Sequence, residues 1–175
     1  MSLIEVMITT LVATTLLAIS VPAGRSALDA LTLGGARQQV GLALQTARLR
    51  AVSANRPMRL RLNCPGTGQF RVVEVTGVTS TDSSADRCDE AVFTYPGPRD
   101  SDQATPSHDG PMGQLSSQIE TLSGPDLEFS PDGTTRIVVG GVAQTMTEDA
   151  LVQVTRQGET KEILINALGR IKQMQ

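Results

Sequence analysis

The first residues of this chain form one long apolar run, which limits the possible folds more than any other feature. Residues 3–21 read LIEVMITTLVATTLLAISV, close to the roughly 20 apolar residues with which an α-helix crosses a bilayer. Its threonine hydroxyls can donate to carbonyls one turn earlier in a helix. The run has neither the preceding positive charges nor the clean A-x-A site of a signal peptide. We therefore expect a transmembrane or partner-facing helix.

Glu5 places a carboxylate inside this apolar run. A charge within a membrane-spanning helix costs roughly 2.5–3.5 kcal/mol on insertion scales, so such a residue usually has a function and a partner. No Lys or Arg precedes Arg25, which lies about 30 Å further along a helix. The nearest cation is the α-amino group of Met1, in the same chain or in a neighbouring subunit. Pairing with a neighbour would make burial of this charge favourable only in an assembly.

Helical periodicity continues beyond the apolar run. Pro22 lacks an N–H and clashes with the preceding turn, so it predicts a kink, and Gly34–Gly35 is a second weak point. An apolar stripe at helical spacing follows, made of Val40, Leu44, Ala47, Ala51 and Val52. Asn55-Arg56-Pro57 is typical of a helix end. We expect one interrupted helix over residues 2–54, whose second half packs on a globular domain.

The remainder is typical of β-structure. Residues 58–62 alternate apolar and polar side chains, and residues 69–76 follow a turn, which predicts an antiparallel hairpin. Further strands are expected at 126–129, 136–139, 151–156, 161–166 and 168–173. Residues 79–125 are rich in Ser, Thr, Asp, Gly and Pro and predict a long surface excursion. The predicted fold class is α+β, with a long N-terminal α-helix, kinked at Pro22, packed on a C-terminal antiparallel β-sheet domain.

Cys64 and Cys88 are the two cysteines of the chain, and neither belongs to a CxxC pair. With one His in the sequence, no zinc site is expected. Two lone cysteines behind an apolar segment indicate an oxidising compartment and one disulfide, and the alternative is a pair of buried free thiols. A bridge would close a loop of about 25 residues and stabilise the fold by roughly 3–4 kcal/mol in the chain-entropy model.

Charges are segregated along the sequence. Residues 37–71 contain seven arginines and no acid, a balance of +7, whereas residues 72–132 contain twelve acids and two arginines, a balance of −10. The simpler interpretation is a solvated basic face on one element and acidic loops on another. The alternative is an electrostatic surface that helps subunits to stack.

The N-terminal sequence MSLIEVMITTLVATTLLAISVPA resembles the mature N-terminus of type IV pilins and type II secretion pseudopilins. In that family a prepilin peptidase cuts before residue 1, residue 1 is N-methylated, and a Glu at position 5 pairs with a subunit's N-terminal amine. The resemblance implies assembly roles for Met1, Glu5 and Pro22, although Met1 departs from the usual Phe. It also implies that residues 1–24 are a transmembrane and filament-core helix segment and residues 25–175 a periplasmic globular domain.

Two further segments, ALQTARLRAVSANRPMRLRLN and EILINALGRIKQ, resemble the GspH/FimT branch of pseudopilins. The resemblance implies a structural subunit of a type IV pilus or type II secretion-type filament. Its partners would be other pilin or pseudopilin subunits, the inner membrane before assembly, and the prepilin peptidase. The subunit would then pass from the inner membrane into a periplasmic or extracellular filament.

Two alternatives remain at this point. Some FimT-like proteins bind DNA through a C-terminal G-R-x-R motif, and Gly169-Arg170-Ile171-Lys172 is a near match. Arg170 and Lys172 would face the same side of a strand, where they would equally form an ordinary basic solvent face. The second alternative is a membrane-anchored hydrolase. His108 stands in a loop, however, and the chain has no P-loop, GxSxG or HExxH motif. No catalytic, cofactor-binding or metal site is predicted.

Overall fold

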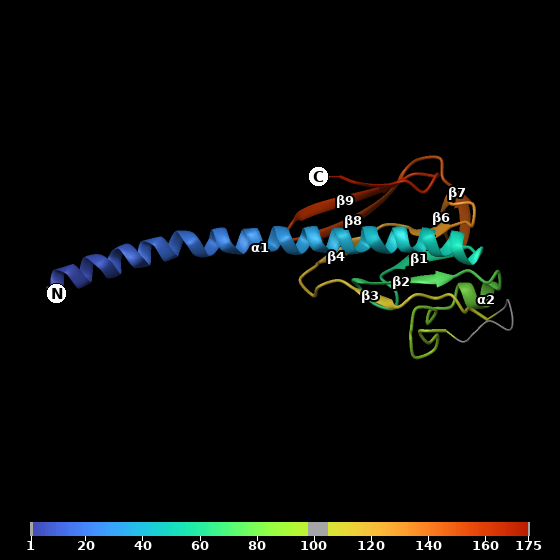
Figure 1. Ribbon diagram of the computed structural model, residues 1–175, viewed down its shortest axis with the longest axis horizontal. Coiled ribbons are helices and arrows are strands. Elements are labelled where there is room, and N and C mark those ends of the chain that lie inside the picture. The colour runs from blue at the N-terminus through green and yellow to red at the C-terminus, as the bar shows by residue number, and fades with distance from the viewer. Residues whose placement is uncertain (1, 98–104, 175) are drawn as a thin grey trace.

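A single long helix carries a β-rich domain. The computed structural model describes residues 2–97 and 105–174, and within the first helix it describes residues 17, 19 and 21–24 by their backbone alone. Helix α1 (Leu3–Ala54) has 52 residues, a length of about 78 Å. Its N-terminal half projects beyond the domain, and its C-terminal half lies along it (Figure 1). The predicted long helix and antiparallel β domain are confirmed.

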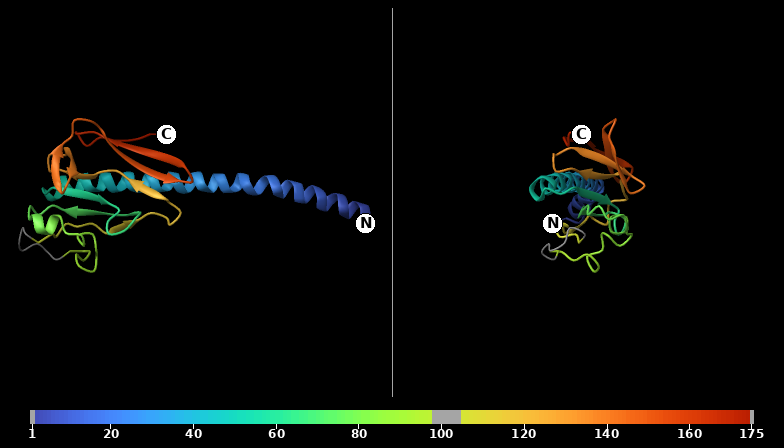
Figure 2. Two further views of the ribbon diagram at one scale, coloured as in Figure 1. Left: turned by 180° about the vertical axis from the view of Figure 1, so that it is seen from behind. Right: turned by 90° about the vertical axis from the view of Figure 1, so that its right-hand side faces the viewer.

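Helix α1 is continuous through Pro22 and through Gly34–Gly35. Its projecting half curves gently (Figure 2), so the curvature is spread along the helix and no break in helical structure marks Pro22. The helix ends where the sequence predicted. Asn55 adopts a left-handed conformation with φ 52°, and the N–H of Arg56 donates to the carbonyl of Ala51 over 3.2 Å, which satisfies a terminal carbonyl of the helix.

In the described residues, two antiparallel sheets follow the helix. The first has the order β3-β2-β1-β5-β6-β7 and the second the order β10-β9-β8-β4. The strands are β1 (Met58–Leu62), β2 (Gln69–Glu74), β3 (Met112–Gln114), β4 (Thr121–Ser123), β5 (Asp126–Phe129), β6 (Thr135–Val139), β7 (Val142–Thr145), β8 (Ala150–Arg156), β9 (Glu159–Ile165) and β10 (Ile171–Gln173). The predicted hairpin is confirmed as β1–β2, with Leu60 opposite Val72.

The prediction that residues 79–125 form one surface excursion is wrong in part. A short helix, α2 (Thr79–Asp82), begins the segment, but β3 then adds to the edge of one sheet and β4 to the edge of the other. Leu115 and Leu122 are buried in the core. These strands have three residues each, too few for alternation to be visible in the sequence. Strand β7 was also not predicted.

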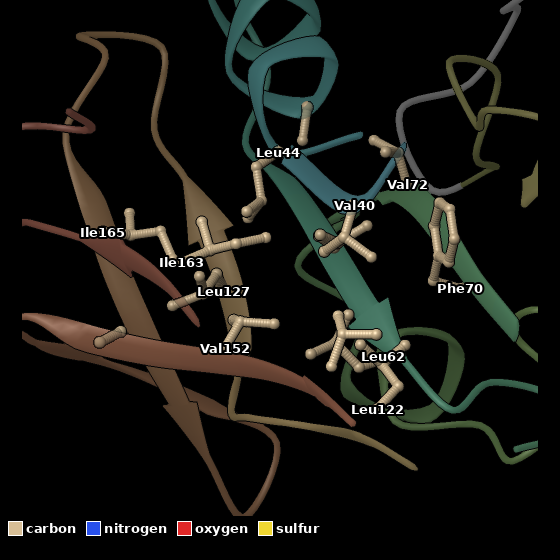
Figure 3. Packing of buried hydrophobic residues seen from close by; sticks show 14 of the residues in the cluster. Val40, Leu44, Leu62, Phe70, Val72, Leu122, Leu127, Val152, Ile163 and Ile165 are labelled. Atoms are coloured by element: carbon tan, nitrogen blue, oxygen red, sulfur yellow. The ribbon is translucent and has the colours of Figure 1, made fainter. Parts of the chain in front are cut away.

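The core lies where α1 meets both sheets. Val40 and Leu44 of the helix point toward the sheets (Figure 3) and are fully buried. The labelled partners from the strands are Leu62, Phe70, Val72, Leu122, Leu127, Val152, Ile163 and Ile165. Val52, predicted to belong to the same stripe, is 52% exposed. It follows the buried Ala51 by one residue, and each residue turns the chain by about 100° around the helix.

Candidate functional site

The projecting half of α1 has no partner in the described part of its own chain. Its large apolar side chains are exposed, from 81% for Leu3 to 48% for Val6. The hydroxyls along it satisfy their own backbone, since those of Thr9, Thr10, Thr14, Thr15 and Ser20 donate to carbonyls three or four residues earlier. Because these hydroxyls are bonded to the helix itself, they add little polarity to the surface of the projecting half.

The sequence predicts a membrane-spanning segment over residues 3–21. Within the side chains that the structure describes, no helix is at once long enough and apolar enough to cross a membrane. The side chains of residues 17, 19 and 21 in this segment lie outside the described residues.

Glu5 lies in the first turn of α1. One of its carboxylate oxygens accepts from the backbone N–H of Ser2 over 3.4 Å, which is long for such a bond. Among the described residues, this carboxylate contacts only its own helix terminus, a weak interaction of about 0.3–1 kcal/mol when exposed. Two other predicted assembly residues fall outside the described structure, Met1 entirely and Pro22 for its side chain.

Cys64 and Cys88 form a disulfide, with their Cα atoms 5.5 Å apart. Both residues are buried beside Val73 in a small cluster separate from the main core. The bridge fixes the segment after α2 to the β1–β2 turn. The predicted disulfide is present in the structure.

The prediction of a solvated basic face is wrong. All seven arginines between residues 37 and 71 have partners within the chain. Three form ion pairs, Arg56 with Glu74 at 2.6 Å, Arg59 with Glu128 at 2.9 Å and Arg61 with Asp126 at 3.5 Å. Arg37, Arg48, Arg50 and Arg71 donate to backbone carbonyls. The three acids belong to the segment with the −10 balance, so three of the seven arginines are neutralised by the oppositely charged segment.

Glu74 is the centre of a buried polar network that the sequence did not reveal. Its carboxylate accepts from Arg56 and from the backbone N–H groups of Ser107 and His108. Burial raises the pKa of this carboxyl, but these hydrogen bonds outweigh burial, and the pKa of Glu74 lies below its ordinary value. The buried Asp109 beside it pairs with Arg87. The network holds the 105–111 segment against β2.

His108 was considered as a catalytic candidate for an anchored hydrolase. Its Nδ1 lies 2.9 Å from the Ser107 hydroxyl and 3.2 Å from the Glu74 carboxylate. A Ser–His–acid relay requires the hydroxyl and the carboxylate on different ring nitrogens. Both contacts here use one nitrogen, so this arrangement is not a relay. Among the described residues, no group of three or more His, Cys, Asp or Glu side chains could hold a metal ion.

Residues 36–169 match the model of the family described as "Type II transport protein GspH". The chain belongs to the GspH family. Two crystal forms of the type IV minor pilin FimU of Pseudomonas aeruginosa (strain PAO1) are similar in structure. The first is 15% identical, covers 82% of this chain and 88% of that chain, and has a TM-score of 0.50. The second is 16% identical, with coverages of 82% and 93% and a TM-score of 0.49.

No curated protein gives a significant match. At 15% identity the likeness to FimU shows the fold, a long helix joined to an antiparallel domain. Membership of the GspH family confirms the predicted pilin or pseudopilin type. The chain is therefore a structural subunit of this type, and it assembles with other pilin-like subunits. Pilin and pseudopilin families are structural, in agreement with the expectation of a non-enzymatic role.

The C-terminal Gly-Arg-x-Lys sequence of this GspH family member lies in the β9–β10 loop and in β10. Gly169 has φ 72°, and a Cβ atom on it would lie 2.5 Å from the carbonyl oxygen of Gly133. The glycine is thus required for packing of the loop. Arg170 and Lys172 are both exposed, and Arg170 borders a cleft of about 610 Å³ beside Arg48.

One more long-range contact had no signal in the sequence. Asp29 and Arg156 form an ion pair at the point where α1 leaves the domain. The two residues are 127 positions apart, and no local pattern relates them. This pair ties the helix to the end of β8.

Proposed function

We propose that this protein enters its filament through the projecting half of α1, with the Glu5 carboxylate paired to the Met1 amine of a neighbouring subunit. The exposed apolar helix carries this proposal. Between residue 2 and Arg25, Glu5 is the only charged side chain, and the large apolar side chains described in this segment are exposed. Burial of apolar surface against neighbouring helices would stabilise an assembly by roughly 25 cal/mol per Å².

Before assembly, the same segment would hold the subunit in the inner membrane after the prepilin peptidase has cut before residue 1. Residues 1–24 would then form the anchor, with Pro22 near its end, and residues 25–175 a periplasmic domain. The Cys64–Cys88 disulfide supports this placement, since disulfides persist in oxidising compartments such as the periplasm.

The intermolecular pair competes with the weak contact between Glu5 and the Ser2 N–H. If Glu5 only capped its own helix, a neutral side chain that still accepts a hydrogen bond, such as Gln, would preserve its function. The capping contact is long and is available to any subunit without a partner. A charge pair in surroundings of low dielectric constant gives a stronger interaction that exists only between subunits.

Glu5→Gln and Glu5→Ala distinguish the two roles. Both variants are expected to reach wild-type levels in the membrane and to lose filament assembly, because each removes the charge. Thr9→Ala, which removes a hydroxyl bonded only to its own helix, is the matched control and should assemble. Filament yield is measured beside membrane level. Retained assembly of Glu5→Gln would assign a capping role, and normal assembly of Glu5→Ala would refute the proposal.

DNA binding is a second candidate, favoured by the exposure of both Arg170 and Lys172. Changing both residues to Gln should weaken binding and reduce its dependence on salt, because each cation neutralises one phosphate. Absence of DNA binding by the wild-type protein at low salt would remove this candidate.

A further inference from the structure

The two sheets of the described domain end in four edge strands. These are β3 and β7 in the first sheet and β10 and β4 in the second. The outer side of an edge strand carries N–H and C=O groups that no neighbouring strand satisfies, so a strand of another chain can pair with it. Proteins usually protect such edges, and three of these four are protected by contacts within the described part of the chain.

The protection of β3, β4 and β10 comes from side chains or from α1. In β3, the outward N–H of Met112 donates to the Glu90 carboxylate. The Gln39 side chain donates to the Gln114 carbonyl of the same strand over 3.2 Å. In β4, the Leu122 carbonyl accepts from a side chain of the β1–β2 turn over 2.6 Å, and β10 packs against α1. These three edges therefore have few backbone groups left for another strand.

Strand β7 has no such protection among the described residues. It is the longest of the four edge strands, with four residues against three in each of the others. Its one strand neighbour in the described sheet is β6. The opposite side of β7 is therefore open to a further strand.

The turn of the β6–β7 hairpin decides which backbone groups face outward. Gly140 and Gly141 have φ 60° and 84°, as in a two-residue type I′ turn, and the pair that flanks such a turn is hydrogen-bonded across the hairpin. Backbone groups alternate in direction along a strand, so the N–H and C=O groups of Ala143 and Thr145 face outward. Within the described residues, no other segment bonds to them.

The β6–β7 hairpin also lacks the charged side chains that keep other strands away from an edge. Residues 137–147 read IVVGGVAQTMT, without a charge. Val139 and Val142 are 52% and 63% exposed. Strand β7 lies at the end of the domain where α1 ends (Figure 1). A strand added there would leave the projecting half of the helix unobstructed.

Symmetry and charge narrow the choice of the strand that this edge accepts. A second copy of this chain could offer only its own β7, since its other described edges are protected. Two β7 strands would pair about a two-fold axis, which closes an assembly at two copies, whereas a filament needs a head-to-tail contact. The matching strand therefore belongs to a different pilin-like subunit. It carries no charge on the paired segment, because β7 offers no opposite charge across the pair.

We infer that β7 is an acceptor edge, to which an uncharged edge strand of a different pilin-like subunit adds by main-chain hydrogen bonding. The inference goes beyond the proposed function, which concerns the projecting helix and Glu5. It assigns the contact between the globular domain and this partner to the backbone groups of Ala143 and Thr145.

A peptide that mimics a strand tests the edge directly. The probe is a short peptide of alternating Thr and Val, added to the full-length protein in detergent micelles. It should slow the hydrogen exchange of the Ala143 and Thr145 amides about tenfold, because both amides gain a partner. The Met112 amide on the protected β3 edge is the matched control and should not change. Equal slowing at Met112, or no slowing at Ala143 and Thr145, overturns the inference.

Ala143→Pro tests the same edge in assembly. Proline removes an outward N–H but no hydrogen bond of the hairpin, so the variant should fold, lose the protection by the peptide, and enter filaments several-fold less. Gln144→Ala keeps every backbone group and is the matched control. Thr145→Lys places a charge on the edge without removing an N–H, and it should act like Ala143→Pro even if proline disturbs the fold.

Two outcomes of these variants contradict the inference. The first is normal assembly of a folded Ala143→Pro or Thr145→Lys variant. The second is a full-length wild type that sediments as a dimer and becomes monomeric on Ala143→Pro, since this would show that β7 pairs with itself. The Glu5 variants should leave the peptide result unchanged, so failure of the proposed function is distinguishable from failure of this inference.

Discussion

The two halves of α1 differ in what surrounds them, although they form one continuous helix. In the C-terminal half, every third or fourth residue from Leu33 to Ala51 is buried against the sheets, and arginines of this half donate to carbonyls of the domain. The large apolar side chains described in the projecting half are exposed, and the hydroxyls of Thr9, Thr10, Thr14, Thr15 and Ser20 donate to backbone carbonyls of the same helix. One half of the helix is thus stabilised within the subunit, while the other depends on contacts that the single chain cannot provide.

Removing the projecting half should have the largest effect on assembly and almost none on folding. A chain that begins at Arg25 retains the buried stripe and both sheets, so we expect a folded monomer with a melting temperature close to that of the whole protein and a complete loss of filaments. Thermal unfolding and sedimentation measure the two properties. If the shortened chain does not fold, the division at residue 25 is wrong.

The same Leu→Ala substitution should lower the free energy of unfolding by very different amounts in the two halves of α1. Leu44→Ala removes a fully buried side chain and should lower the free energy of unfolding by about 4 kcal/mol. Leu11→Ala, at a position that is 65% exposed, should change it by less than about 0.5 kcal/mol. Denaturant unfolding of both variants gives the comparison. Similar losses would mean that the projecting half contributes to the fold of the subunit.

Loss of the disulfide should lower the free energy of unfolding of the domain by somewhat less than Leu44→Ala does. Its cysteines are 24 residues apart, and loop closure of this length contributes roughly 3–4 kcal/mol in the chain-entropy model. The double variant Cys64→Ser, Cys88→Ser should therefore unfold at lower denaturant concentration. Thiol labelling of the unreduced, denatured wild type should find no free thiol. Stoichiometric labelling of both cysteines would exclude the bridge.

Acid should weaken the domain half through Glu74. Its folded pKa lies below its ordinary value of 4.5, so its stabilisation is complete above the unfolded pKa and is lost as pH falls through the folded pKa. Glu74→Gln should cost about 2 kcal/mol near neutral pH and should flatten the decline of stability below pH 4.5. Denaturant unfolding of both proteins across this pH range is the measurement. An unchanged acid slope in Glu74→Gln would show that other carboxyls cause the decline.

How much the sequence could predict depended on the range of the interactions. The long helix, its end at Asn55 and the β1–β2 hairpin follow from local signals: periodicity, the Asn55-Arg56-Pro57 sequence and a turn. The edge strands β3 and β4 have no such signal, because their pairing partners are distant in sequence. The basic segment was misinterpreted for the same reason. Its charge was visible, but the pairing of Arg59 with Glu128, 69 residues away, depends on neighbouring strands of the folded sheet.

The candidate site divides in the same way. Glu5 could be identified from the sequence because the apolar residues on both sides of this charge are its immediate neighbours in the chain. The Glu74–Asp109–Arg87 network could not be found, since it joins the end of β2 to a segment about 35 residues later. The acids and arginines that form it look like ordinary surface residues in the sequence.

The lengthwise placement of α1 along the domain has a mechanical consequence (Figure 1). Tension applied to the projecting half acts parallel to the contact between the helix and the sheets, so it loads the contact in shear. Core contacts from Leu33 to Ala51 would share the load and would have to yield together, instead of separating one after another from an end. The Asp29–Arg156 pair lies at the first point of this contact. A subunit drawn into or out of a fibre by its helix would thus move as one rigid piece with its domain.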